Sequence, residues 1–145
     1  MKKTADRPCD GLCCRRVAIV GALRRHGRNG AGPCPIRDNA TLLVKTPHGL
    51  VAIFGCGHAG YVNILKAVCK ELPDDRLLSV VGGLHLESAS DKIMAEAITY
   101  TDSVKADGFT FYGGHCTGDK TIRYFRERYG GQVVLPMRAG RIIEY

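Results

Sequence analysis

Gly55-Cys56-Gly57-His58 directly follows the apolar run at 50–54, so a histidine stands just beyond a glycine turn at the end of a predicted strand. The same succession occurs twice more, as Gly82-Gly83-Leu84-His85 after 77–81 and as Gly113-Gly114-His115 after 109–112. Glycine allows a tight backbone turn, and ligands of α/β sheets gather at the carboxyl ends of strands. We therefore expect the three histidines to converge at one edge of a sheet, although they are distant in sequence.

The stretches around these motifs alternate between strand-like and helix-like patterns. Two β-branched and apolar runs, 41–46 and 50–54, flank the turn residues Pro47-His48-Gly49 and predict a hairpin. The other predicted elements are helices over 61–72, from Ser88 or Ser90 to Val104, and over 119–129, and strands over 77–81, 109–112, 132–136 and 141–145. The order ββ-α-β-α-β-α-ββ indicates an α/β fold.

The apolar spacing within each predicted helix indicates which side faces the core. The expected inward residues are Val62, Leu65, Cys69 and Leu72 in the first helix, Ile93, Ala97, Tyr100 or Thr101, and Val104 in the second, and Ile122 and Phe125 in the third. The strands are apolar nearly throughout, which favours burial on both faces of the sheet.

Residues 1–35 differ in composition from residues 36–145, so we expect a basic, Cys/Gly/Arg-rich leader, irregular in structure, followed by a folded body. The leader holds eight of the 21 Lys and Arg but two of the 14 Asp and Glu, and therefore most of the net charge of +7. Because the body is nearly neutral and the leader lacks interleaved aromatic residues, nucleic-acid binding is not expected. The apolar stretch 17–21 of the leader fits a short strand, and we expect the leader to contribute little to the core.

No apolar run is long enough to span a membrane, and the basic start lacks the apolar segment of a signal peptide. Seven cysteines are an odd number, which favours reduced thiols over a disulfide framework. We therefore expect a cytoplasmic protein without a membrane anchor.

Imidazole nitrogens make the three motif histidines candidate metal ligands. A lone histidine at a strand end is more often a hydrogen-bonded structural residue, but three in equivalent places favour a shared site. His58, His85 and His115 are thus candidate ligands of a divalent metal, zinc first, with manganese or iron as alternatives. His26 in the leader and His48 in the hairpin turn are expected on the solvated surface.

Three short motifs resemble those of a known family. The motif at 55–63 is similar to "GCSHAGIVN", the one at 82–86 to "GGFHL" and the one at 114–118 to "GHCTG". These are signatures of a branch of the metallo-β-lactamase superfamily, typified by the dihydropterin-ribofuranosylaminobenzene 5′-phosphate synthase of methanopterin biosynthesis. The resemblance covers about residues 36–145.

The resemblance implies the C-terminal half of an αββα sandwich, with a metal site, usually binuclear, at one edge of the sheets. It makes His58 the isolated third-motif ligand and His115 the final histidine, whereas His85 falls near where many relatives place a bridging aspartate. The family's main ligand cluster, His-x-His-x-Asp-His, has no counterpart in this sequence. The metal site of this chain is therefore expected to be incomplete.

Four residues beyond His115 have two interpretations each. Cys116 could be a metal ligand or a nucleophile, or an inert small residue in a tight turn. Thr117, Lys120 and the helix start at Asp119 could hold a substrate phosphate. Helix capping and a solvated lysine explain the same residues equally well.

The resemblance implies a metal-dependent hydrolase or a pterin-linked transferase acting on a small phosphorylated molecule, in which the metal generates hydroxide or polarises an oxygen. Two alternatives stay open: a non-catalytic metal-binding or interaction subunit, and a truncated gene remnant. We expect the isolated chain to bind at most one divalent ion and to be inactive as a monomer. Because its helices can cover one face of the sheet only, a homodimer or a separately encoded N-terminal half should cover the other.

Overall fold

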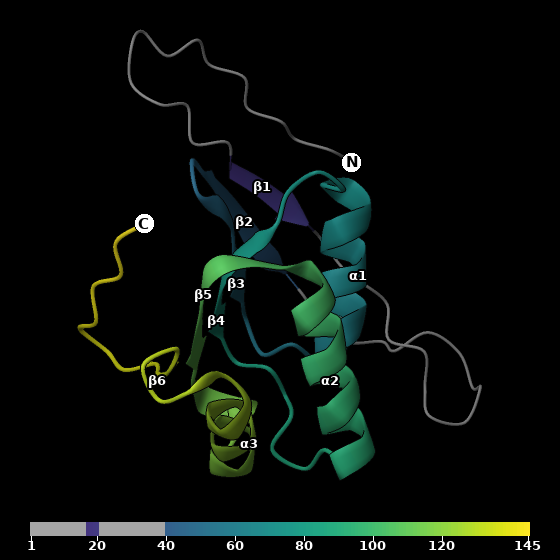
Figure 1. Ribbon diagram of the computed structural model, residues 1–145, viewed down its shortest axis with the longest axis vertical. Helices are drawn as coiled ribbons and strands as arrows, with labels where there is room; N and C mark the ends of the chain where they lie inside the picture. The colour runs from purple at the N-terminus through teal and green to yellow at the C-terminus, as the bar shows by residue number, and fades with distance from the viewer. Residues whose placement is uncertain (1–16, 21–39) are drawn as a thin grey trace, which may run out of the picture.

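The structure, a computed structural model, describes residues 17–20 and 40–145, which form one sheet with helices packed on it (Figure 1). The six strands follow the order of the sequence: β1 (Val17–Val20), β2 (Thr41–Thr46), β3 (Gly49–Phe54), β4 (Leu77–Gly82), β5 (Lys105–Gly113) and β6 (Val134–Pro136). Strands β1 to β3 pair antiparallel, whereas β3 to β6 are parallel neighbours. The α/β class and the hairpin predicted from the sequence are confirmed.

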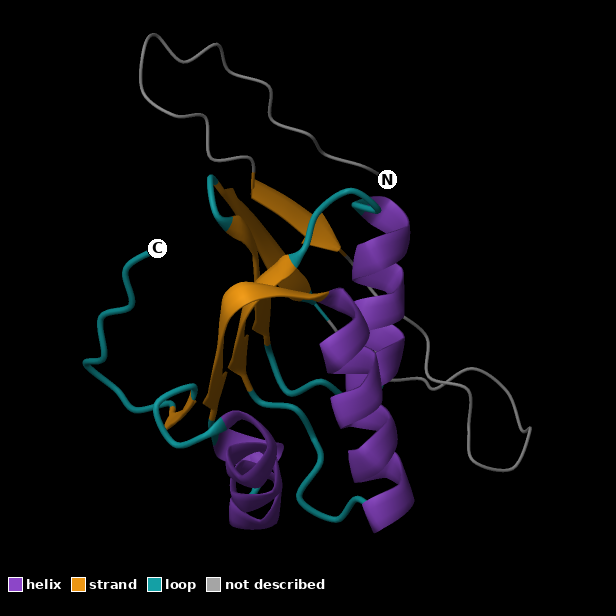
Figure 2. Ribbon diagram, viewed as in Figure 1, coloured by secondary structure: helices purple, strands orange, loops and turns teal. Residues whose placement is uncertain are grey.

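Three helices connect the parallel strands: α1 (Tyr61–Glu71), α2 (Asp91–Val104) and α3 (Asp119–Tyr129). Connections between parallel strands are right-handed, and here each one moves the chain one strand further in the same direction. All three helices must therefore lie on the same face of the sheet, and Figure 2 shows α1 and α2 packed side by side. Aromatic rings join the layers, since the ring of Phe125 lies 4.6 Å from that of Phe111 and 6.1 Å from that of Tyr61.

The inward face of α2 matches the prediction at Ala97 and Thr101 and differs from it at the first inward residue. Met94, Ala97 and Thr101 are buried, whereas Ile93 is 39% exposed, so the prediction that Ile93 faces the core is wrong. Consecutive helical residues point about 100° apart, and Ile93 and Met94 are both apolar, so the sequence pattern alone could not choose between them. The capping prediction is confirmed, because the Oγ of Ser90 accepts a hydrogen bond from the N–H of Ile93 at 3.4 Å.

The same uncertainty of phase affects α1, whereas α3 matches its prediction closely. Leu65 of α1 is buried as expected, but Val62, Cys69 and Leu72 are half-buried. The residues that fill the core from this helix are Tyr61, Ile64, Leu65 and Val68. In α3, Phe125 is fully buried and Ile122 packs against the core.

The predicted last strand, 141–145, is absent: these residues form no strand. The segment instead crosses the sheet face opposite the helices, where the hydroxyl of Tyr145 donates a hydrogen bond to the Oγ of Ser79 at 2.7 Å. The guanidinium of Arg141 lies over the ring of Tyr112, 5.8 Å from its centroid. An extended run of apolar residues beside an edge strand does not have to extend the sheet if side-chain contacts hold it elsewhere.

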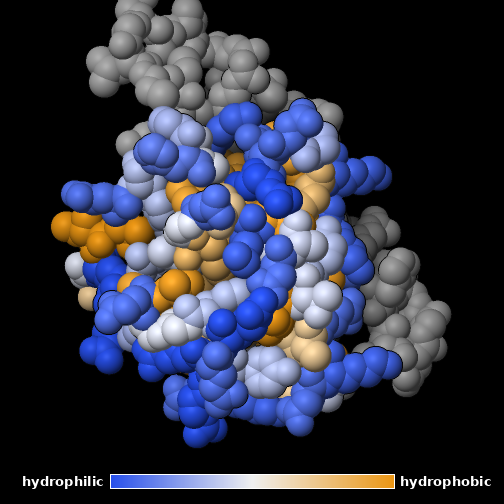
Figure 3. All heavy atoms as spheres, viewed as in Figure 1, coloured by the Kyte–Doolittle hydropathy of each residue, from blue (hydrophilic) through white to orange (hydrophobic). Residues whose placement is uncertain are grey.

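The face opposite the helices is apolar on both sides of this segment. Val51 and Val81 lie on it and are buried, and Val44 and Ile53 are half-buried beside them. Figure 3 shows polar and apolar side chains interspersed over the viewed side, with an apolar group at the C-terminal segment, where Ile142 is 86% exposed. The sheet face opposite the helices is therefore apolar, and residues after β6 cross it but leave Val44 and Ile53 partly exposed.

Strand β1 lies within the basic leader and pairs residue by residue with β2, from Val17 opposite Val44 to Val20 opposite Thr41. The short strand suggested by the apolar stretch is thus present, and this part of the leader extends the sheet. The boundary at residue 35 stays a prediction, and the rest of the leader, with His26 and four cysteines, lies outside the described residues. None of the helices in the described part of the chain has the length and apolarity needed to cross a membrane.

Candidate metal centre

The parallel pairing of β3, β4 and β5 aligns the three glycine–histidine motifs at one edge of the sheet. Phe54 is the register partner of Gly82, and Gly82 is the partner of Gly113, so the strands end at the same level. Backbone hydrogen bonds continue this alignment beyond the strands, from the N–H of Gly83 to the oxygen of Gly55 (2.9 Å) and from that of Gly114 to the oxygen of Gly82 (3.1 Å). The loops that carry the histidines are therefore held against one another.

Glycine is required at the centre of this arrangement. The φ angle of Gly82 is 123°, and a Cβ atom placed there would lie 2.2 Å from the carbonyl oxygen of Phe54. Gly83 has an ordinary φ, but its Cβ would lie 2.8 Å from the oxygen of Gly55 and 2.9 Å from the Sγ of Cys116. The two glycines allow the three loops to approach more closely than any larger residue would permit.

His58 and His85 form one part of the site. Their imidazole rings meet edge to face, with centroids 4.8 Å apart and an interplanar angle of 85°. His58 is half-buried and His85 is exposed, and a cavity of about 280 Å³ between the start of α1 and α2 is lined by His85, Asn63, Ser88 and Glu96. Two of the predicted ligands are thus brought together beside a cavity large enough for part of a small molecule.

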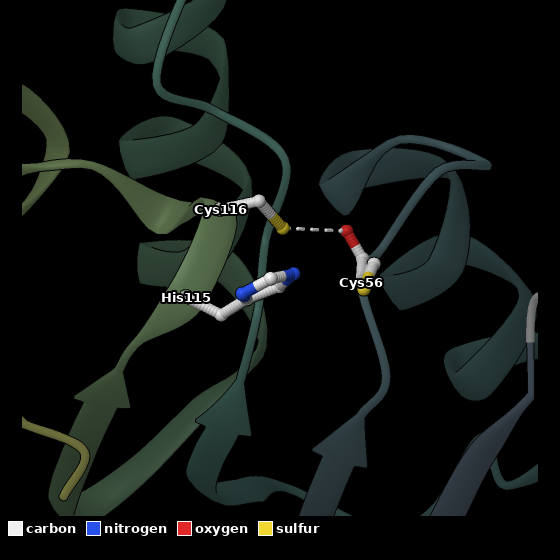
Figure 4. Close-up of side chains that lie close together, drawn as sticks. All are labelled: Cys56, His115 and Cys116. Carbon is white, nitrogen blue, oxygen red and sulfur yellow. Dashed lines mark hydrogen bonds between the residues drawn. The ribbon is translucent and has the colours of Figure 1, made fainter.

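His115 forms the other part, together with two cysteines (Figure 4). One ligand atom from each of Cys56, His115 and Cys116 lies within 4.8 Å of the other two. The thiol of Cys116 donates a hydrogen bond to the carbonyl oxygen of Cys56 at 3.2 Å, which joins the loop after β5 to the loop after β3. Within the described residues, this is the group of three potential ligands that meets the distance requirement for a shared metal ion.

Two of the candidate ligands have strained backbones. His85 and His115 have φ angles of 51° and 49°, in the left-handed region that residues with a Cβ seldom adopt. Such conformations cost about 1–2 kcal/mol per residue and concentrate at functional sites. Both residues are exposed at the ends of their strands.

The residues after His115 have structural contacts in this geometry. Thr117 is 1% exposed, and its hydroxyl lies 2.7 Å from the oxygen of Gly114 and accepts a hydrogen bond from the N–H of Leu84 at 3.2 Å. The ammonium of Lys120 lies 2.9 Å from a carboxylate oxygen of Asp91 and donates to the oxygen of Ala89. These contacts connect α3 to the loop before α2, and the substrate role of both residues stays a prediction.

The sequence interpretation overlooked Cys56, and it slightly favoured an inert Cys116. The signal was present, because Cys56 shares the Gly-x-Gly-His motif of His58, but cysteine also suits a tight turn as a small residue. His48 lies exposed in the hairpin turn, where its N–H donates to the Oγ of Thr46, as expected for a surface residue.

The fold has a close counterpart among solved structures, although no family model matches the chain. The crystal structure of Tm1679, a metal-dependent hydrolase of the β-lactamase superfamily, is similar with a TM-score of 0.70 and 29% sequence identity. The similarity covers 89% of this chain and 53% of that chain. The chain is therefore similar in fold and in sequence to this member of the metallo-β-lactamase superfamily.

Two curated proteins of Methanocaldococcus jannaschii are also similar to this metallo-β-lactamase-fold chain. One is 7,8-dihydropterin-6-methyl-4-(β-D-ribofuranosyl)-aminobenzene-5′-phosphate synthase, 28% identical over 110 residues, which are 76% of this chain and 36% of that protein. The other is an uncharacterised protein, 30% identical over 87 residues, which are 60% of this chain and 30% of that protein. The chain therefore spans between about a third and about half of the length of its relatives.

The residues at the strand ends suit a divalent metal. Imidazole and thiolate are the ligands that zinc prefers, and iron and manganese also accept imidazole. The donor set of this metallo-β-lactamase-fold chain therefore fits the group that its hydrolase neighbour uses.

Proposed function

We propose that the chain contributes His58, His85 and His115 to the metal centre of a metal-dependent enzyme that acts on a small phosphorylated substrate. The observation that carries the proposal is the common register of Phe54, Gly82 and Gly113, which sets the three histidine loops side by side. A bound divalent metal would act there as a Lewis acid toward a phosphate or carbonyl oxygen.

In that reaction, the residues of this chain would bind and orient the metal and the substrate. His85 and His115, the two histidines with left-handed backbones, are exposed at the strand ends, and the cavity lined by His85 offers space for a substrate group. A second cavity of about 360 Å³ is lined by His115, Arg126, Arg138 and the start of α3. Guanidinium groups and helix N-termini both favour anions, so a substrate phosphate fits this second cavity.

Hydrolysis and pterin-linked transfer each have a relative in support. The solved neighbour is described as a metal-dependent hydrolase, and the curated relative is a synthase of a dihydropterin-linked aminobenzene phosphate. We place transfer to or from a pterin-type ring second, because the structural similarity, which covers 89% of this chain, is to the hydrolase. Cys56, Cys69 and Cys116 form no disulfide, which fits a reducing compartment, and we propose the cytoplasm.

A partner should complete the centre. The similarity covers about half of the hydrolase chain, and the apolar sheet face at Val44, Val51 and Ile53 is crossed by a single segment. A second copy of this chain, or a separately encoded N-terminal half carrying His-x-His-x-Asp-His, would cover this face and add ligands. A subunit that binds metal without catalysis is the alternative, and a gene remnant is the third.

The test combines light scattering of the full chain with phosphodiesterase and phosphomonoesterase assays after zinc or manganese is added. We expect light scattering to show a dimer or aggregates, and the full chain alone to have no turnover. Turnover should appear once the N-terminal half of a homologue is co-expressed with it. His58→Ala and His85→Ala should abolish that turnover, whereas His48→Ala should not. Metal binding without turnover in the co-expressed complex would instead support the non-catalytic subunit, and upstream DNA that encodes the missing cluster out of frame would support the remnant.

A further inference from the structure

The strand-end site contains two thiols that the proposed function does not use. Cys56 lies in the loop after β3, and Cys116 follows His115 in the loop after β5; both are half-buried. Their sulfur atoms and an imidazole nitrogen of His115 lie within 4.8 Å of one another. Figure 4 shows the imidazole of His115 between the two loops, on the side where Cys116 faces Cys56.

We propose that Cys56, His115 and Cys116 form a zinc position with two thiolate ligands, which uses His115 of the proposed centre but neither His58 nor His85. This proposal does not rest on catalysis, because it concerns binding by the chain alone. It also specifies the metal: two thiolates favour zinc over manganese and magnesium, which prefer oxygen ligands.

The distances are compatible with one ion after small side-chain movements. Zinc lies about 2.3 Å from thiolate sulfur and about 2.0–2.1 Å from imidazole nitrogen, so tetrahedral ligand atoms stand roughly 3.3–3.8 Å apart. Three atoms that already lie within 4.8 Å of one another need shifts of about an ångström to reach this spacing. Rotation of exposed His115 about its side-chain bonds supplies such a shift without moving the sheet.

The hydrogen bond between Cys116 and Cys56 positions the first sulfur for this role. It holds the Sγ of Cys116 3.2 Å from the carbonyl oxygen of Cys56 and therefore over the loop that carries the second thiol. When a metal binds, each thiol releases its proton to water and the sulfur bonds to the ion instead. Metal binding would thus replace the hydrogen bond of the Cys116 thiol with a sulfur–metal bond.

Gly83 supplies the space that the sulfur occupies. A Cβ atom at this position would lie 2.9 Å from the Sγ of Cys116 and 3.3 Å from the Cα of Cys56, so it would stand between the two thiol residues. Because the φ angle of Gly83 is not in the left-handed region, room rather than backbone freedom explains glycine here. Three protein ligands leave a fourth position open to water or to a group from a partner.

Cobalt(II) substitution of the full chain, under a phosphine reductant, tests the proposal. Thiolate-to-cobalt charge transfer should produce a near-ultraviolet band in the wild type, and zinc should displace the cobalt and remove it. Cys56→Ser and Cys116→Ser should each lose at least about half of the band, and Gly83→Ala should weaken cobalt binding about tenfold, the size of effect that outer-shell changes produce. His58→Ala with His85→Ala should retain the band, which would show that this zinc position does not depend on the His58–His85 pair of the proposed centre.

Two control variants account for the other thiols. Cys69→Ser removes the thiol in α1, and a variant with serine in place of Cys9, Cys13, Cys14 and Cys34 removes those of the leader; both should keep the full band. A band that survives in the Cys56→Ser, Cys116→Ser double variant, or that disappears with the leader cysteines, would overturn the proposal. Should the variants fail to fold, cadmium-113 NMR of the wild type decides, since a resonance typical of nitrogen and oxygen ligands alone contradicts thiolate coordination.

Discussion

The imidazole rings of His58 and His85 meet edge to face with their centroids 4.8 Å apart, although one follows β3 and the other follows β4. The contact results from the parallel pairing of these strands, in which Phe54 is the partner of Gly82. Two imidazoles at this separation can bind one ion if their rings rotate. The strand pairing thus brings together two candidate ligands that are distant in sequence. The predictions below test the elements that create this relationship.

The left-handed backbone of His85 reverses the usual ranking of glycine and alanine. With φ at 51°, His85→Gly should be more stable than His85→Ala by about 1 kcal/mol in free energy of unfolding. At exposed Arg123 within α3 the order should be opposite, with alanine better than glycine by about 1 kcal/mol. Urea denaturation of the four variants measures their free energies of unfolding. If the alanine variant is more stable than the glycine variant at both positions, the backbone of His85 is not strained.

The close approach of β3 and β4 depends on Gly82. Gly82→Ala places a Cβ 2.2 Å from the carbonyl oxygen of Phe54 on a backbone with φ of 123°, and we expect it to lower the free energy of unfolding by about 3 kcal/mol or more. Gly131→Ala is the matched control, because a Cβ there meets no atom within 4 Å, and its effect should stay within about 0.5 kcal/mol. Equal effects of the two substitutions on denaturation midpoints would show that the strand ends are more loosely packed than described.

Tyr61 should make the fold sensitive to alkali. Burial raises the pKa of Tyr61 above its usual value, opposed by its hydrogen bond to Thr101, where the two oxygens are 2.8 Å apart. Because the folded-state pKa is the higher one, its contribution to stability is complete below the unfolded pKa of about 10 and is lost as pH rises above it. Tyr61→Phe should cost about 1 kcal/mol at neutral pH through the lost hydrogen bond. Above about pH 10, its free energy of unfolding should fall less steeply than that of the wild type, and parallel slopes would disprove the role of Tyr61.

The leader should matter through β1 alone. Deleting residues 1–16 removes no described element, and we expect the melting temperature to change by less than about five degrees. Deleting residues 1–35 also removes the four-residue pairing of β1 with β2 and exposes an edge strand, so a larger decrease is expected. Differential scanning fluorimetry of the two deletion variants distinguishes these outcomes. An unchanged melting temperature after the longer deletion would support the expectation that the whole leader contributes little to the core.

The fold was predictable where local signals and tertiary packing agree. The boundaries of α3 and the cap at Ser90 follow directly from spacing and capping chemistry, and the glycine turns mark the strand ends. The first inward residue of α2 was not predictable, since adjacent Ile93 and Met94 are both apolar and the packing of the helix on the sheet decides between them. The position of residues 141–145 on the sheet face likewise depends on contacts with Ser79 and Tyr112, which no local sequence pattern predicts.

The site was predictable in its location but not in its grouping. Parallel order places all three histidines at one edge, but the side-chain directions divide them, with His58 beside His85 and His115 beside the cysteines. The pairing of Cys56 with Cys116 spans 60 positions and arises from the close approach that Gly83 permits. A small residue in a turn and a metal ligand have the same sequence signature, so geometry was needed to distinguish them.

His115 offers the most direct test, because it belongs to both the proposed catalytic centre and the proposed zinc site. The measurement is the zinc content of the full chain after loading and exhaustive dialysis, for wild type, His115→Ala and His48→Ala. The account predicts about one zinc ion per chain in the wild type and in His48→Ala, and about a tenth of that or less in His115→Ala. Equal zinc content in His115→Ala and wild type, or none in the wild type, would contradict a metal site at the carboxyl ends of β3, β4 and β5.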